Sequence, residues 1–211
     1  MQPILTVLVI IAMNTIFKTV MLRYVTSYFQ YILELVQILF VILFASFINT
    51  SASFAISREN SCLRTLKTIP VSYRKQVFMK LIVPFIGSTV VTLISLIILA
   101  CLKQISVVNA LLTFIYSITL VAFLEIVSLN SDLKHPSIDS SDSNTSSIVG
   151  LISVLMPVLS IGVMFLLNYL EVHFILSFFI AYVIILLIGI PYVILFNKNM
   201  TKRFIALEMR N

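Results

Sequence analysis

The chain alternates between long apolar runs and shorter polar stretches, and six of the runs are long enough to cross a membrane. A spanning helix needs about 20 mainly apolar residues. Backbone groups in lipid must be paired within the protein, and the runs lack the alternation of barrel strands, so we predict helices. No linker divides residues 1–211, which we interpret as a single all-α polytopic domain. The predicted spans cover about residues 4–22, 31–56, 77–102, 107–129, 148–167 and 174–196.

The polar stretch 57–80 lies between the second and third predicted spans and carries six of the fourteen basic residues. On a helical wheel, Arg64 and Lys67 fall opposite an apolar arc. This pattern predicts a short amphipathic helix that lies along the membrane surface. The apolar arc consists of Cys62, Leu63, Leu66 and Ile69.

Both ends of this predicted helix have recognisable signals. Proline disfavours helical geometry in the residue before it, so Pro70 is predicted to end the helix. Ser57 can cap its first turn, and Ser72 can cap the helix that follows. Glu59 suits the helix dipole but projects into the apolar arc, so it needs a partner such as Arg58.

Composition indicates that the chain lies in a lipid bilayer, and the distribution of charge indicates which side of the membrane each connection lies on. The chain is 60% hydrophobic and only 10% charged, whereas soluble domains carry about 25% charged residues. Segments 57–80, 130–147 and 197–211 hold eleven of the basic residues. The other three, Lys18, Arg23 and Lys103, belong to the segments on the opposite side. Basic residues favour the cytoplasmic side, so both termini are predicted to lie inside. The net charge of +6 is thus interpreted as topology information and not as a nucleic-acid site.

The sequence contains none of the catalytic or cofactor-binding motifs considered below. His135 and His173 are predicted to lie on opposite membrane faces, so they cannot share a metal ion. The chain has only four glycines and no phosphate-binding loop, paired-cysteine site or nucleophile-elbow motif. We therefore expect no enzymatic activity, no metal site and no cofactor bound by this chain.

Two acidic residues, Glu34 and Glu125, fall inside predicted spans. Burying a charge in hydrocarbon costs several kcal/mol, so such residues are functional candidates. Both lie within about a turn of a predicted span end, where snorkelling to the surface or protonation explains them. The absence of an acid at mid-depth argues against an ion-coupled transporter.

The order of residues in 57–80 resembles the cytoplasmic signature of type-2 ATP-binding-cassette exporter permeases. In that family an Arg-Glu-Gly-x-x-x-x-x-Leu-x-x-x-Pro-x-Ser…Lys pattern joins the second and third of six spans. Asn60 stands where glycine is usual. A lesser similarity, over residues 129–136, is to a span junction in a double-length branch of these permeases. The residues that match the main pattern are Arg58, Glu59, Leu66, Pro70, Ser72 and Lys80.

The resemblance implies that 57–80 is a coupling segment that inserts into a separate ATPase subunit. Arg64 and Lys67 would face the ATPase, while Leu63 and Leu66 would pack on the spans or fill the groove of the partner. The expected function is a permease subunit that couples ATP hydrolysis by that partner to export. The substrate would be hydrophobic or amphipathic, such as a peptide, a lipid-like molecule or a drug. The expected partners are the ATPase, a second permease subunit and membrane lipid.

Other interpretations remain open at this point. Family members usually begin with an interfacial helix, whereas Met1-Gln2-Pro3 leads directly into the first span. This favours one half of a double-length permease or a truncated permease, which would pair with another permease half. The alternative function is a polytopic scaffold or regulator without transport activity. An intramembrane enzyme would require Glu34 or Glu125 beside a base. The absence of tryptophan and the abundance of Ile, Asn and Lys indicate an AT-rich bacterial genome, hence the bacterial plasma membrane.

Overall fold

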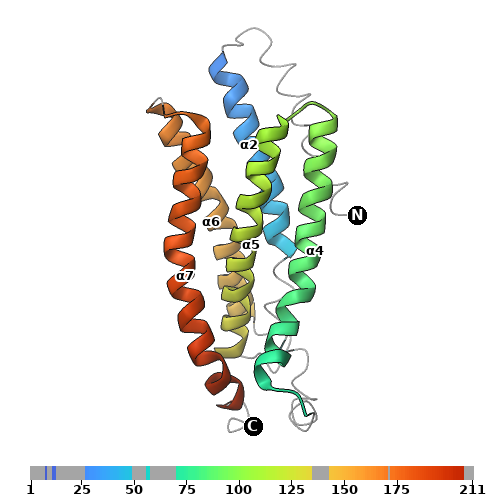
Figure 1. Ribbon diagram of the computed structural model, residues 1–211, viewed down its shortest axis with the longest axis vertical. Helices are drawn as coiled ribbons and strands as arrows, with labels where there is room; N and C mark the ends of the chain where they lie inside the picture. The colour runs from blue at the N-terminus through green and yellow to red at the C-terminus, as the bar shows by residue number, and fades with distance from the viewer. Residues whose placement is uncertain are drawn as a thin grey trace.

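A computed structural model describes residues 8, 11–12, 27–48, 56–57, 70–134, 143–170 and 172–206 of the chain. Within these residues there are five long helices and no strands, which confirms the all-α class for the described part (Figure 1). The helices are α2 (Ser27–Ile48), α4 (Tyr73–Cys101), α5 (Val107–Lys134), α6 (Ser143–Tyr169) and α7 (Phe174–Ala206).

Helices α4 to α7 are each long and apolar enough to cross a membrane, with mean hydropathies of 2.2 to 2.8 in their most apolar windows. In α2 the apolar stretch with described side chains is Glu34–Ser46. The first predicted span, 4–22, lies outside the described residues apart from three helical positions, 8, 11 and 12. Four helices of this length and composition are those of a multi-pass membrane protein.

The helices form an antiparallel bundle around α5, which contacts each of the other four. Helices α4 and α6 run in one direction and α2, α5 and α7 in the other, as Figure 1 shows. We call the end that holds the start of α4 and the ends of α5 and α7 the basal end; it is at the bottom of Figure 1. The polar stretch 57–80 enters and leaves at this end.

Several helix ends differ from the predicted spans. Helix α4 begins four residues before residue 77, α5 continues five residues past 129, and α7 continues ten residues past 196. These extra turns carry polar side chains, which lower the hydropathy without breaking the helix. In α2 the described helix extends to Ile48, and Ile56 lies in a turn. The end of the span predicted over 31–56 lies outside the described residues.

The interface between α4 and α5 is lined by small polar side chains. Ser88, Thr92 and Ser95 follow one face of α4 and are all buried. The hydroxyls of Thr92 and Ser95 donate to carbonyls of their own helix, at 2.8 Å and 2.9 Å. Small side chains let two helices approach closely within a membrane. On this face the Ser88 hydroxyl donates to Oε1 of Glu125 on α5, at 3.3 Å.

Candidate functional site

Asp132, near the end of α5, binds the backbone where the polar stretch 57–80 begins. Its Oδ2 accepts hydrogen bonds from the backbone amides of Ile56 at 2.7 Å and of Ser57 at 3.2 Å. Its Oδ1 accepts a third hydrogen bond, from the Ser57 hydroxyl. The side chain is only 2% exposed, and Lys80 on α4 acts on it electrostatically. Hydrogen bonds to a carboxylate are stronger than neutral ones, so Asp132 fixes residues 56–57 on α5.

A hydrophobic cluster at the basal end holds both ends of the polar stretch. Ile56 and Val77 are fully buried within it. The Tyr73 ring, at the start of α4, lies 5.5 Å from the Phe204 ring of α7, centroid to centroid. Both ends of the stretch therefore pack into one unit with α5 and α7. This basal cluster consists of Ile56, Val77, Leu81, Leu129, Leu133, Phe196, Met200 and Phe204, with Tyr73 and Ile126 packed against it.

Asn130 connects α5 to α7 beside the basal cluster. Its Nδ2 donates to the Tyr192 hydroxyl at 2.6 Å, and its Oδ1 accepts a hydrogen bond from the Arg203 guanidinium. The Tyr192 ring also packs edge-on against Phe123 of α5, with centroids 5.6 Å apart. Asn130 thus uses both ends of its amide, and the two helices are joined at two positions on α7.

The far end of the polar stretch is the start of α4. Pro70, Val71 and Ser72 are exposed, and Ser72 occupies the N-cap position, as predicted. Its side chain, however, makes no capping hydrogen bond. The Gln76 side chain instead donates to the Val71 carbonyl at 3.0 Å, and the Gln76 amide donates to the Ser72 carbonyl at 3.2 Å. The predicted capping hydrogen bond from the Ser72 hydroxyl is therefore wrong. Hydrogen bonds from Gln76 connect the turn to the helix instead.

The remaining predicted coupling residues lie outside the described part of the chain, as does the amphipathic helix predicted between Ser57 and Pro70. Their roles therefore stay predictions. These residues are Arg58, Glu59, Leu63, Arg64, Leu66 and Lys67.

Glu125 is buried between α4 and α5. It is 1% exposed, and its Oε1 accepts a hydrogen bond from the Ser88 hydroxyl at 3.3 Å. Helix α5 continues to Lys134, which places Glu125 more than two turns from the helix end. The interpretation that its carboxylate snorkels to the surface is therefore wrong.

Glu34 lies at the opposite end of the bundle and is half-buried. Its Oε1 accepts a hydrogen bond from the Asn109 side-chain amide at 2.6 Å, which links α2 to the start of α5. Among the described residues, the hydrogen bonds to both acids come from a hydroxyl or an amide and not from a base. The intramembrane-enzyme alternative therefore gains no support from these contacts.

Sequence reasoning missed the residues that organise the basal end, namely Asp132, Asn130, Tyr192 and Arg203. Asn130 and Asp132 fall within 130–147, which was predicted to be a cytoplasmic connection between two spans, whereas α5 continues to Lys134. They also fall within 129–136, the stretch with the lesser family similarity. The signal that could have found them is the pair Asn130 and Asp132, which directly follows the apolar run that ends at Leu129. Polar side chains at the end of a helix need hydrogen-bond partners when they are buried.

A scan against protein-family models and searches of curated proteins and of solved structures found no match. The role of the basal end is therefore argued from the contacts that its residues make. The described groups there form anchoring contacts between backbone, side chains and three helices. These contacts attach both ends of the polar stretch to the bundle.

Proposed function

We propose that this chain is the permease subunit of a bacterial ATP-binding-cassette exporter. In this proposal the chain has six spans and both termini in the cytoplasm. Its coupling segment, 57–80, binds a separate ATPase subunit. The chain pairs with a second copy or a homologous half. A hydrophobic or amphipathic substrate passes between the two units or through a lateral opening.

The observation that carries the proposal is the anchoring of both ends of 57–80 to one packed unit. The beginning is fixed to α5 by the three hydrogen bonds to Asp132. The end continues into α4, whose Tyr73 and Val77 pack on α7 and the basal cluster. A segment fixed in this way passes rigid-body motion to three helices together. A loop that only touched lipid would have no need of a buried carboxylate at its start.

This anchoring supports a specific sequence of events. Closure of the ATPase subunits displaces the coupling segment along the membrane surface. The displacement reaches α5 through Asp132 and α7 through the basal cluster. The three helices then move relative to α2 and α6, which opens or closes the path between the permease units.

The orientation has a direct test in two exposed serines at opposite ends of the bundle, Ser72 and Ser106. In a cysteine-free background, we expect a membrane-impermeant maleimide to label Ser106→Cys on intact cells. Ser72→Cys should react only after the cells are permeabilised, because its end of the bundle is cytoplasmic. Labelling of Ser72→Cys from outside would reverse the orientation and place 57–80 out of reach of a cytoplasmic ATPase.

The ATPase dock is tested with Arg58→Ala and Glu59→Ala. We expect either change to reduce co-purification of the ATPase subunit about tenfold or more, the effect of losing a residue central to an interface. The control is Lys198→Ala, which removes an exposed basic residue of α7 outside the coupling segment. Unchanged co-purification in both variants would contradict the permease and favour the scaffold alternative.

A further inference from the structure

We infer that the face of the bundle formed by α4, α5 and α7 binds one anionic phospholipid of the leaflet at the basal end. The headgroup lies at Arg74 and Lys75, and an acyl chain follows the groove between α5 and α7. The inference is independent of the permease proposal, because it requires only that the bundle spans a membrane.

The first observation is a basal cavity of about 530 Å³ with a cationic rim and an apolar floor. Arg74 and Lys75, in the first turn of α4, form the rim and are both exposed. Phe78, Leu81 and Met200 line the part beneath them. Positive charge over an apolar slot matches a phosphate headgroup over its acyl chains. The positive end of the α4 dipole lies at the same place and favours an anion.

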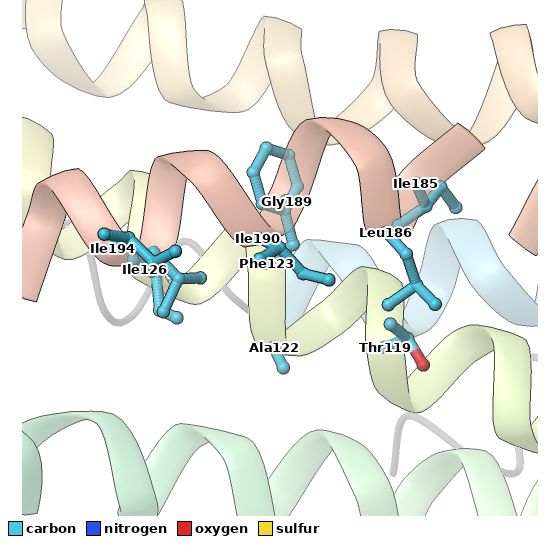
Figure 2. Close-up of a pocket in the computed structure, with 10 residues that line it drawn as sticks. Thr119, Ala122, Phe123, Ile126, Ile185, Leu186, Gly189, Ile190 and Ile194 are labelled. Carbon is cyan, nitrogen blue, oxygen red and sulfur yellow. The ribbon is translucent and has the colours of Figure 1, made fainter. Parts of the chain in front are cut away.

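The second observation is that the groove continues from this cavity towards the bundle centre. A pocket of about 240 Å³ between α5 and α7 shares Ile126 and Val193 with the basal cavity. Figure 2 shows Ile126 beside Ile194 at one end of it and Leu186 directed towards Thr119 at the other. The lining is almost wholly hydrocarbon, which suits an acyl chain and offers nothing to a polar ligand.

Gly189 lines the middle of this groove, next to Phe123. A Cβ atom built there would lie 3.5 Å from Cδ2 of Phe123. Figure 2 shows the Phe123 ring lying across α7 at Gly189. The Phe123 ring thus packs directly on α7 at this point, and a Cβ atom there would be in ordinary van der Waals contact with it.

The length of the groove fits a single leaflet. Along α7 it extends from Met200 to Ile185, which at 1.5 Å per residue is about 22 Å. Half of a bilayer with its headgroup region is about 20–22 Å thick. One phospholipid therefore covers the groove from its cationic rim to its inner end.

Charge favours an anionic occupant beside Arg74 and Lys75. The described acidic residues are Glu34, Glu125 and Asp132. Glu125 and Asp132 are buried, and Glu34 is at the opposite end of the bundle. Among the described residues, no exposed carboxylate therefore lies beside Arg74 and Lys75. An anionic membrane surface supplies that charge, at roughly a fivefold preference for each basic side chain.

The test uses the absence of tryptophan from the chain. Phe78→Trp places a single fluorophore in the basal cavity at a side chain that is 62% exposed. Phe179→Trp is the matched control, on α7 away from both cavities and 61% exposed. Each variant is reconstituted in phosphatidylcholine vesicles with a small fraction of brominated phosphatidylglycerol or of brominated phosphatidylcholine.

We expect brominated phosphatidylglycerol to quench the fluorescence of the Phe78→Trp variant several-fold more than brominated phosphatidylcholine does. The two lipids should quench the Phe179→Trp variant equally. Adding Arg74→Gln and Lys75→Gln to the Phe78→Trp variant should remove the difference between the lipids.

Equal quenching of the Phe78→Trp variant by the two lipids would overturn the inference. Quenching by neither lipid would also overturn it, because a protein surface would then cover the groove. Native mass spectrometry of the unaltered chain tests the same inference without an introduced fluorophore. The chain should retain phosphatidylglycerol over phosphatidylcholine, and equal retention of the two lipids would count against the site.

Discussion

Replacing Asp132 with alanine is expected to lower the free energy of unfolding by about 2 to 4 kcal/mol. The change leaves the amides of Ile56 and Ser57 without their acceptor in a buried site. Each unpaired buried donor costs about 1 to 3 kcal/mol. The beginning of the polar stretch 57–80 would then be released from α5. The loss can be measured by heat denaturation or by titration with a denaturing detergent in mixed micelles.

Two control variants test whether the loss of stability comes from the Asp132 carboxylate. Asp132→Asn keeps a side-chain oxygen that can accept from the amides, so we expect a smaller loss of about 1 kcal/mol. Ser131→Ala changes the neighbouring, half-buried residue and should have little effect. Equal stabilities for Asp132→Ala and Ser131→Ala would mean that Asp132 does not hold residues 56–57. If the account is correct, Asp132→Ala also uncouples ATP hydrolysis from transport under conditions in which the variant remains folded.

Replacing Phe204 with alanine is expected to cost about 3 to 5 kcal/mol. The side chain is fully buried in the basal cluster and its ring packs against that of Tyr73. Truncation removes these contacts and leaves a cavity where α4 meets α7. We expect a lower midpoint of unfolding, and faster proteolysis near the start of α4.

The adjacent residue provides the control for this change. Ile205 follows Phe204 on the same helix but is 41% exposed. Ile205→Ala should cost less than about 1 kcal/mol, because no packed site is emptied. Similar losses for the two variants would show that the end of α7 is not packed as described, and would remove the contact proposed to carry motion from α4.

Hydropathy predicted helices α4 to α7 because each contains a long apolar window, with a mean hydropathy of 2.2 to 2.8. It placed their ends less well at the basal end. Residues 130–134 of α5 and 197–206 of α7 are polar in composition yet helical. Their polar groups find partners in the bundle, as Asn130 does with Tyr192 and Arg203. A sliding average over one segment contains no information about partners on another.

The candidate site was predictable in part. The signals at Pro70 and Ser72 located the junction before α4, although the capping bond is made by other groups. Glu125 could be found as an intramembrane acid, but its burial against Ser88 depends on the approach of α4 to α5. The contact from Asp132 to Ile56 spans 76 positions and involves a backbone amide. No local pattern encodes an acceptor for a main-chain donor so far away.

The most direct test of the central claim is the composition of the complex purified with the unaltered chain. The chain is extracted from its membrane in mild detergent, and its partners are identified and counted by mass spectrometry. We predict an ATPase subunit with a Walker motif in about equal molar amount, lost in the Arg58→Ala and Glu59→Ala variants. A folded chain that purifies with lipid alone, or whose partners lack a nucleotide-binding motif, would contradict the account.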